Sequence, residues 1–574
     1  MKKVFLEVFS LAAMLLASHA AGAVSEWDSV SSGVHFTWAS RFVHYGQHAV
    51  PQIHHAADTS IIAWKGERVS MLALAYTKDN APAVGVRFSG KSNTLKALEN
   101  AGSSVRFVSY VVSDEKRGCG VNDFTSPITM VPDVIEIDKP QRLGGCSVHP
   151  VWVTLEIPRN MKAGRLRVGI ELFDSASSNV IGSLKLEVEV LNRVLPEPAD
   201  YRFHSDFWQQ PYSVSRFYGF ERWSPDHFQA LKPYLKFLAR SGQKVVTAIM
   251  FHEPWGEQSN DKFDAMIKTS YGKEGWHYDY SIFDEYVRLC DSCGINAQIN
   301  CYSMIPWDKT FQYYDETKGK DVVLRTEVGI EPYKWIWVPF IKSFAAHLKE
   351  MGWFDKTCIA MDERPMEDML QAYNVLKEAE PDFKMALAGT YHPELADKLY
   401  DYCVGWQEHF TPEELNMRKG RGWVSTTYTC CPHLRPNLET YNTPAECAFL
   451  PVYCIANGFD GYLHWSWMNW TDDPLHDTRF KFFPPGDTYL IYPGDLSLPG
   501  SEVRSAVRYE SYIEGVQQAE KICILREAAS STVSARKYLD KIESCLSQFV
   551  SGNLPDDETS ARLMIQLESL LNKK

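Results

Sequence analysis

The segment KTCIAMDERP, residues 356–365, joins a short apolar run to two adjacent carboxylates. Residues 357–361 are apolar enough to be enclosed on both faces, which is typical of a strand inside a parallel sheet. Pro365 cannot continue a central strand because it lacks a backbone N–H group. The segment therefore predicts a buried strand that ends in Asp362 and Glu363.

Seven other short segments share this character, and amphipathic stretches such as residues 225–242 and 334–352 separate several of them. Alternation of this kind predicts a parallel sheet crossed by helices. The eight strand candidates are YRFHSDFW (201–208), KVVTAIM (244–250), INAQINCY (295–302), KTCIAMDE (356–363), KMALAGTY (384–391), DYCVGW (401–406), GWVSTTYT (422–429) and GYLHWSW (461–467). They predict a (β/α)8 TIM barrel over residues 200–500, with its active site at the carboxyl ends of the strands.

The chain on either side of the predicted barrel has a different pattern. Residues 24–195 hold short β-rich runs such as SMLALAY (70–76) and VWVTLEIP (151–158), and many of them alternate apolar and polar positions. This predicts an N-terminal antiparallel β-sandwich domain, which a stiff proline linker at residues 195–198 joins to the barrel. Residues 501–574 are charged and show helical spacing of apolar side chains. They predict a helical C-terminal extension that packs on the barrel or on a partner.

Residues 1–23 have the features of a secretory signal peptide. Two lysines precede an apolar run at residues 8–17, and Ala21 and Ala23 give the A-x-A spacing of a signal peptidase site. The run is far shorter than the roughly 20 residues that span a bilayer. We therefore expect an exported protein, periplasmic or extracellular, without stable membrane insertion.

Charge and motif content argue against several classes of function. A formal net charge of −13 at pH 7 repels phosphate backbones, which argues against a nucleic-acid partner. The 17 histidines never form the two-His-plus-carboxylate spacing of a metallohydrolase. The sequence also lacks P-loop, G-x-G-x-x-G and G-x-S-x-G motifs. We therefore expect no metal and no cofactor, while the oligomeric state stays open.

All 13 cysteines follow the predicted signal peptide, so at least one stays unpaired within a single chain. Cys119 and Cys146, each beside glycine in a region of strands and turns, are the best disulfide candidates. Cys290 and Cys293 have the spacing of a redox motif, but they end an apparent helix. We interpret them as buried core residues.

The dipeptide Asp-Glu occurs five times, beginning at residues 114, 284, 315, 362 and 557, so its presence alone carries no information. Solvated turns, loops or a helix explain the other four copies. Glycoside cleavage needs a proton donor for the departing oxygen and a group that stabilises positive charge at the anomeric carbon. A carboxylate pair at a barrel rim therefore predicts Asp362 and Glu363 as catalytic residues. The alternative is a structural pair bound to Arg364.

Aromatic residues gather in the same part of the chain. Thirteen of the 17 tryptophans lie between residues 201 and 470, and sugars present apolar C–H faces to such rings. Packing in the barrel core explains most of them. Trp465 and Trp467 are the exception, because indoles at a barrel rim need a cover. The strand-end side chains that we predict to bind substrate are His204, Asn300, Tyr391, Tyr428, Trp465 and Trp467.

Four segments together resemble one known family. They are AWKGERV (63–69), the MDERP that ends the fourth strand candidate, GDTYLIYPG (486–494) and SAVRYESYIEGVQQAE (505–520). These segments are similar to the β-N-acetylgalactosaminidases of glycoside hydrolase family 123, and the resemblance covers nearly the whole chain after residue 23. It implies an exo-acting enzyme that removes terminal β-linked GalNAc from glycans or glycolipids.

The resemblance also implies a substrate-assisted, retaining mechanism, in which the sugar's own 2-acetamido oxygen attacks the anomeric carbon and forms an oxazolinium intermediate. Glu363 would protonate the leaving group and later activate water, while Asp362 would hold the acetamide N–H group. Tyr391 or Tyr428 would steady the acetamide oxygen.

In the same scheme, Trp465 and Trp467 would form the wall on which the sugar stacks. Two other interpretations stay open at this point. One is a retaining glycosidase in which a carboxylate, such as Asp362, is the nucleophile. The other is a non-catalytic carbohydrate-binding protein. A thiazoline analogue of the N-acetyl sugar tests the first, and hydrolysis of aryl N-acetylhexosaminides tests the second.

Overall fold

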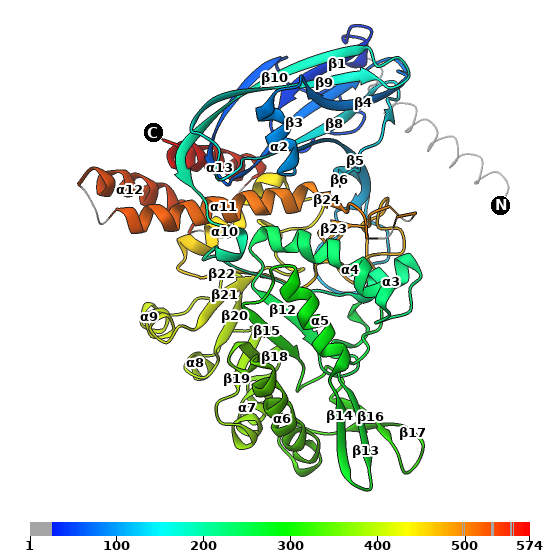
Figure 1. The fold of residues 1–574 in the computed structure, drawn as a ribbon, viewed down its shortest axis with the longest axis vertical. Helices are drawn as coiled ribbons and strands as arrows, with labels where there is room; N and C mark the ends of the chain where they lie inside the picture. The colour runs from blue at the N-terminus through cyan, green and yellow to red at the C-terminus, as the bar shows by residue number, and fades with distance from the viewer. Residues whose placement is uncertain are drawn as a thin grey trace, which may run out of the picture.

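The computed structural model describes residues 26–495, 497–498, 500–529, 533–550, 554 and 556–573. The predicted signal peptide at residues 1–23 lies outside the described residues. A strand-rich N-terminal domain stands on one side of a larger domain of strands and helices, and a long helix lies between the two (Figure 1). Within the described residues, no helix combines the length and the apolar character needed to cross a bilayer.

The N-terminal domain consists of two β-sheets, of order β1-β3-β8-β5-β6-β24-β23 and β2-β10-β9-β4-β7. Their strands are β1 (Val34–Ala39), β2 (Asp58–Lys65), β3 (Arg68–Thr77), β4 (Ala83–Ser89), β5 (Ser104–Asp114), β6 (Ile128–Ile135), β7 (Gln141–Arg142), β8 (Ser147–Glu156), β9 (Gly164–Asp174), β10 (Val180–Val194), β23 (Ile491–Tyr492) and β24 (Arg504–Ala506). Side chains of both sheets, including Phe107, Val151 and Val188, share one core. Strands β2 and β10 run parallel, which departs from the antiparallel sandwich that the sequence predicts.

Eight parallel strands form a nearly closed barrel in the larger domain, and each of the eight predicted strand segments contains one of them. The order is β11 (His204–Phe207), β22 (Gly461–His464), β21 (Val424–Tyr428), β20 (Asp401–Gly405), β19 (Lys384–Gly389), β18 (Thr357–Asp362), β15 (Gln298–Tyr302) and β12 (Val245–Ile249). A single bridge between Ser205 and Gln243 brings the first and last strands of this order together. The sequence prediction of a barrel is confirmed.

Helices cover the outside of the barrel. They are α3 (Tyr212–Tyr218), α4 (Pro225–Leu238), α5 (Ser281–Ser292), α6 (Glu331–Met351), α7 (Met366–Ala379), α8 (Pro393–Ala396), α9 (Pro412–Gly420) and α10 (Pro444–Ala456). The other α-helices of the described residues are α2 (Asn93–Asn100) in the N-terminal domain and α11 (Val507–Ala528), α12 (Val533–Leu546) and α13 (Asp557–Leu571) near the C-terminus.

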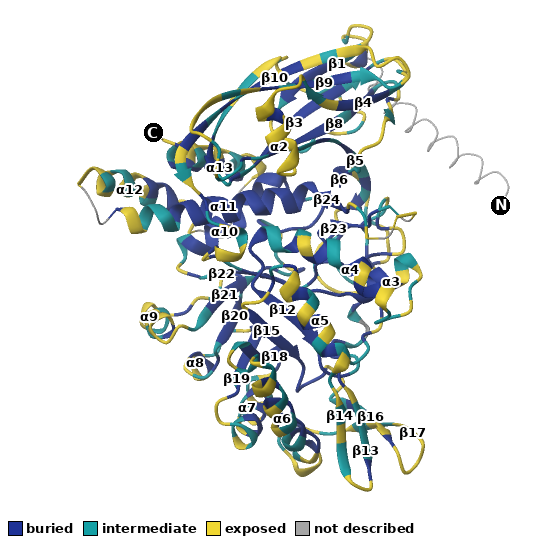
Figure 2. Cartoon of the chain, in the orientation of Figure 1, coloured by how far each residue is buried: buried dark blue, intermediate teal, exposed yellow. Residues whose placement is uncertain are grey.

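Helix α11 begins the predicted C-terminal extension, but it is a buried helix and not one that packs on the outside of the barrel. It lies between the N-terminal domain and the barrel, and most of its length is buried (Figure 2). Ion pairs link it to the N-terminal domain, such as Glu510 with Arg68 over 2.7 Å and Glu514 with Arg41 over 2.5 Å. The helix therefore joins the two domains.

A small sheet that the sequence analysis did not predict projects from the barrel. Its order is β14 (Gly275–Asp279), β13 (Lys268–Gly272), β16 (Thr310–Asp315) and β17 (Lys320–Arg325). These strands are parts of the long connections that follow β12 and β15, so the sheet extends from the carboxyl-end rim of the barrel (Figure 1).

Candidate active site

A cavity of about 270 Å³ lies at the carboxyl ends of the barrel strands. Asp362 is the last residue of β18, Glu363 follows it, and Tyr428 is the last residue of β21. The lining residues are Cys119, Trp208, Trp255, Gln258, Trp307, Asp362, Glu363, Ala388, Tyr428, Thr429, Cys430, Cys431, Leu463, Trp465, Phe483 and Asp487. Seven barrel strands or their connections contribute to this wall, because parallel strands deliver their carboxyl ends to one rim.

The local sequence fixes the position of the carboxylate pair. Strand β18 is buried throughout, and it pairs with β15 on one side and β19 on the other. Pro365 then precedes α7, so the chain turns directly after the pair. Gly389 at the end of β19 lies against this turn, and a Cβ atom there would come within 3.2 Å of the Cα atom of Glu363.

Asp362 is buried, with 7% of its surface exposed, and both of its oxygens are engaged. The indole Nε1–H group of Trp307 donates to Oδ2 over 2.8 Å, and Nη2 of Arg364 forms an ion pair with Oδ1 over 2.8 Å. The Arg364 guanidinium also packs over the Trp307 ring, 4.5 Å from its centre. Burial raises the pKa of Asp362, while the Arg364 charge and the Trp307 hydrogen bond oppose that rise.

Glu363 lies in a different environment, because its side chain is exposed at the cavity. The Tyr428 hydroxyl donates to its Oε1 over 2.5 Å. Burial, and then the negative charge of Glu363, raise the pKa of Tyr428 far above its ordinary value, so the phenol stays protonated. Of the two acidic side chains, only that of Asp362 forms an ion pair with Arg364. The structure therefore does not support the alternative in which Arg364 holds both carboxylates as a structural pair.

Asp487 is a cavity residue that the sequence analysis did not identify. Its Oδ2 accepts a hydrogen bond of 2.7 Å from Nε1 of Trp465, whereas its Oδ1 has no hydrogen-bond partner among the described residues. Asp487 is 1% exposed, and burial raises its pKa to about 6. A buried acceptor without a partner at a cavity wall is suited to receive a hydroxyl group from a bound molecule.

Three further tryptophans line the cavity, Trp208, Trp255 and Trp307. The rings of Trp208 and Trp255 stack with centroids 5.2 Å apart. Trp208 ends the first predicted strand segment and directly follows β11, so the sequence placed it at the rim. Trp255 and Trp307 lie in longer connections after β12 and β15, and no local pattern in the sequence showed that they reach the cavity.

Four of the predicted substrate-binding residues do not line the cavity, namely His204, Asn300, Tyr391 and Trp467. His204 begins β11 and so lies toward the opposite end of the barrel. The Asn300 side chain is buried and donates to Asp401 over 3.3 Å. The Tyr391 hydroxyl is bound by Glu414, and Trp467 is 0% exposed and packs on Phe207 and Tyr509. The prediction that these four meet the sugar is corrected accordingly.

The N-terminal domain reaches the cavity through a disulfide. Cys119 pairs with Cys431, with Cα atoms 5.2 Å apart, and Cys146 remains a free thiol. The predicted partner of Cys119 was therefore wrong. The Gly118 N–H group donates to the Cys431 carbonyl over 3.0 Å, and Gly120 N–H donates to the Phe482 carbonyl over 3.0 Å. These contacts hold the segment that carries Phe483 against the cavity.

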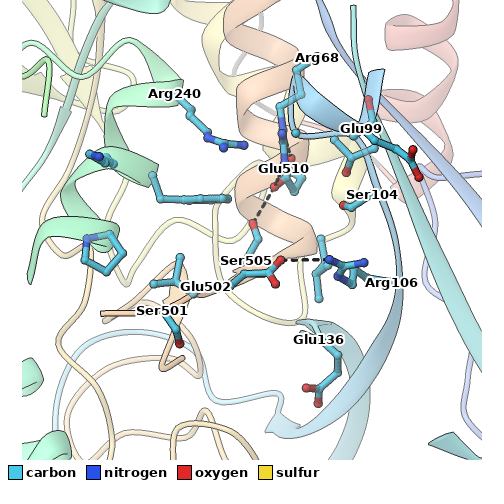
Figure 3. A pocket seen from close by; sticks show the side chains of 18 residues that line it. Arg68, Glu99, Ser104, Arg106, Glu136, Arg240, Ser501, Glu502, Ser505 and Glu510 are labelled. Atoms are coloured by element: carbon cyan, nitrogen blue, oxygen red, sulfur yellow. Dashed lines mark hydrogen bonds and ion pairs between the residues drawn. The ribbon is translucent and has the colours of Figure 1, made fainter. Parts of the chain in front are cut away.

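A larger hollow of about 450 Å³ lies elsewhere, between the N-terminal domain, α4 and the start of α11 (Figure 3). Two ion pairs join charged side chains of its lining, Glu510 with Arg68 and Glu502 with Arg106. Neither Asp362 nor Glu363 is among the residues that line it. Among the described residues, no group of three or more potential ligands could hold a metal ion. The barrel cavity is thus the candidate active site.

Comparisons with known proteins agree with this assignment. Residues 208–525 match the family model of the glycoside hydrolase 123 catalytic domain, and residues 38–173 match that of its N-terminal domain. A solved family 123 glycoside hydrolase from Clostridium perfringens is similar at 25% identity and a TM-score of 0.84, covering 94% of this chain and 98% of that one.

Two other solved structures are too distant to carry an argument. A Bacteroides ovatus GH5 xyloglucanase has 9% identity and a TM-score of 0.29, covering 84% of this chain and 100% of its own. An endo-β1,6-glucanase has 11% identity and a TM-score of 0.33, covering 55% and 76%. The comparison with curated proteins returned no match. The two family models together span most of the described residues, and on that evidence the chain belongs to glycoside hydrolase family 123.

Proposed function

We propose that this chain is an exo-acting β-N-acetylgalactosaminidase that works by a substrate-assisted, retaining mechanism. The observation that carries the proposal is the unequal environment of two adjacent carboxylates. Asp362 is buried and bound on both oxygens, whereas Glu363 is exposed at the cavity with a tyrosine hydroxyl as its partner. A fixed anion beside a carboxyl group that can exchange protons is what this mechanism requires.

The reaction begins when the acetamide oxygen of the bound sugar attacks C1, and the bond from C1 to the leaving oxygen breaks. Glu363 gives its proton to that oxygen. Asp362 accepts the acetamide N–H group, and its charge offsets the positive charge of the oxazolinium ring. A water molecule then attacks C1 and gives a proton to Glu363, so the ring opens and the β configuration is restored.

The surroundings of Asp362 support a positioning role over a nucleophilic one. A donor and a cation bind its two oxygens at 2.8 Å each, which lowers the nucleophilicity of the carboxylate and fixes its orientation. The same two contacts favour the ionised form, which the acetamide N–H group needs as its acceptor.

The remaining cavity residues fit a single sugar. The Trp465 ring offers a face for the apolar C–H surface of the sugar, and Oδ1 of Asp487 offers an acceptor for one of its hydroxyl groups. Tyr428, which lines the cavity, is the tyrosine that we assign to the acetamide oxygen, because the Tyr391 hydroxyl is occupied by Glu414.

The study of the Clostridium perfringens relative concerns glycolipid glycan hydrolysis. This supports a glycan or glycolipid that ends in β-linked GalNAc as the substrate of the present enzyme. The pattern of residues 1–23 supports export to the periplasm or the exterior, where such substrates are met.

The test compares hydrolysis of aryl β-GalNAc and aryl β-GlcNAc by the wild type, Asp362→Asn and a control, Glu367→Gln, at an exposed position on α7. We expect the wild type and the control to prefer β-GalNAc, and Asp362→Asn to lose about a hundredfold or more in kcat. A thiazoline derived from GalNAc should inhibit strongly. Weak inhibition with intact turnover would indicate a carboxylate nucleophile, and binding without hydrolysis would indicate a carbohydrate-binding protein.

A further inference from the structure

Another hollow, of about 340 Å³, lies against the small sheet that projects from the barrel rim. We call it the sheet hollow. It is lined by His252, Asp264, Ala265, Ile267, Lys268, Thr269, Gln312, Tyr313, Tyr314 and Asp321. None of these residues belongs to the lining of the catalytic cavity. The mechanism proposed above gives the hollow no role.

The sheet hollow and the catalytic cavity lie on the same rim of the barrel. Met266 N–H donates to the carbonyl of Ile249, the last residue of β12, over 2.9 Å, so the start of β13 continues outward from that strand end. One short loop serves both hollows, because His252 lines the sheet hollow and Trp255 lines the catalytic cavity. Trp307 N–H donates to the Pro254 carbonyl over 3.0 Å and braces this loop.

The side chains of the sheet hollow are of the types that bind neutral sugars. In the antiparallel register of β16 and β17, Tyr314 pairs with Asp321 and Gln312 pairs with Val323, so these four side chains share one face. Tyr314 is 45% exposed, and an open aromatic ring can stack on the C–H face of a sugar. The amide of Gln312 and the carboxylate of Asp321 can bind hydroxyl groups beside it.

Charge in the sheet hollow is balanced. Of its two acids, Asp264 forms an ion pair of 2.7 Å with Arg222, and the charge of Lys268 offsets that of Asp321. Burial lowers the pKa of His252, so its imidazole is neutral at neutral pH and can both donate and accept a hydrogen bond. Balanced charge gives no preference for an anionic ligand.

The strand that carries Tyr314 is held in place by the packing of its other side chains. On the face opposite Tyr314, Phe311 packs on Phe251 with ring centroids 4.7 Å apart and on Trp337 at 5.9 Å. Tyr313 packs on Trp276 at 5.0 Å. The strand that carries Tyr314 is therefore anchored to the barrel and to α6 by its other face.

We propose that the sheet hollow is a binding site for neutral sugar residues of the glycan on the leaving-group side of the scissile bond. This inference rests on the proposed function, since the catalytic cavity would hold the terminal sugar and the rest of the glycan would leave across the rim. Tyr314 stacks on one such residue, and Gln312 and Asp321 bind its hydroxyl groups. The site makes oligosaccharides better substrates than simple glycosides.

The experiment measures kcat and KM of Tyr314→Ala, Gln312→Ala and a control, Val323→Ala, whose exposed side chain shares the face but does not line the hollow. Two substrates are used, a neutral oligosaccharide that ends in β-GalNAc and an aryl β-GalNAc. We expect Tyr314→Ala to lower kcat/KM on the oligosaccharide about tenfold, chiefly through KM. The kcat/KM of Tyr314→Ala on the aryl glycoside should equal that of the wild type. The control should have the wild-type kcat/KM on both substrates.

Equal kinetics of Tyr314→Ala and the wild type on the oligosaccharide would overturn the inference, as would an equal loss on both substrates. If the wild type cleaves no aryl β-GalNAc, the proposed function fails instead. In that case, titration of the wild type and Tyr314→Ala with lactose tests the hollow alone. Weaker lactose binding by the variant supports a neutral-sugar site, and unchanged binding contradicts it.

Discussion

The indole N–H group of Trp307 donates a hydrogen bond of 2.8 Å to Oδ2 of Asp362. Trp307 comes from the connection after β15, and Asp362 ends the neighbouring strand β18. A side chain from this connection thus sets the orientation and favours the ionised form of the carboxylate that we assign to the acetamide group.

Replacing Trp307 by Phe should impair the enzyme and change its pH dependence. The variant keeps an aromatic ring but removes the donor, so the pKa of Asp362 rises beyond the increase that burial already causes. Since Asp362 acts as an anion, the acidic limb of kcat/KM should move to higher pH, with about a tenfold loss at the optimum. The pH profile on an aryl β-GalNAc measures this. The control is Trp335→Phe, at an exposed position on α6 that does not line the cavity. An unmoved acidic limb would contradict the role.

Tyr428→Phe and Tyr391→Phe form a matched pair. Tyr428 lines the cavity and donates to Glu363 over 2.5 Å, whereas Tyr391 donates to Glu414 over 2.8 Å outside the cavity lining. We expect Tyr428→Phe to lower kcat by about ten- to a hundredfold and Tyr391→Phe to leave it near the wild-type value. Steady-state kinetics on an aryl β-GalNAc decides, and the opposite ranking would move the assignment to Tyr391.

Asp487→Asn should lower activity and raise stability near neutral pH. Burial raises the pKa of Asp487 from 3.8 to about 6, so the folded state holds this proton more tightly than the unfolded state does. The free energy of unfolding therefore falls as the pH rises from about 4 to 6. Asparagine never ionises and still has an oxygen to accept the Trp465 N–H group. The free energy of unfolding of Asp487→Asn should therefore exceed that of the wild type by about 1 to 3 kcal/mol at pH 7 and by little at pH 4.

Thermal unfolding at both pH values measures that gain, and kinetics on aryl β-GalNAc measures the cost in activity. A stability gain of equal size at pH 4 and pH 7 would show that ionisation of Asp487 is not its source. Wild-type kcat/KM in Asp487→Asn would show that its carboxylate does not bind the sugar.

Loss of the disulfide should lower the free energy of unfolding and also weaken substrate binding. Cys119 and Cys431 are 312 residues apart in sequence, and their bond closes a long loop across the two domains. We expect Cys119→Ser to lower the free energy of unfolding by about 2 to 4 kcal/mol. KM should rise as well, because the segment with Phe483 loses its anchor. Cys146→Ser, at a free thiol, is the control in thermal unfolding and kinetics. A wild-type KM in Cys119→Ser would limit the disulfide to a stabilising role.

The sequence predicted the barrel well because each strand is a short apolar run with clear limits. Asp362, Glu363, Tyr428 and Trp465 lie at the cavity because each ends or directly follows a strand. His204 was misplaced because the segment YRFHSDFW was taken as one strand, whereas β11 begins at His204. An error of a few residues in where a strand begins is enough to place a side chain at the wrong end of the barrel.

Other parts of the site depend on contacts between distant segments. Trp307 and Asp487 lie in long connections, and only the folded chain shows which side chains of those connections turn toward the barrel axis. No local pattern could pair Cys119 with Cys431, since the partner lies in the other domain. The burial of α11 has the same cause, because its surroundings come from both domains.

The most direct test of the divided roles of the two carboxylates is the dependence of Glu363→Gln on the leaving group. Turnover of aryl β-GalNAc substrates with good and poor leaving groups is compared with that of the wild type and Asp362→Asn. We predict that Glu363→Gln loses about a thousandfold on poor leaving groups and far less on activated ones, because only the former need a proton. Asp362→Asn should lose activity on both. Full activity of Glu363→Gln on a natural oligosaccharide would contradict the account.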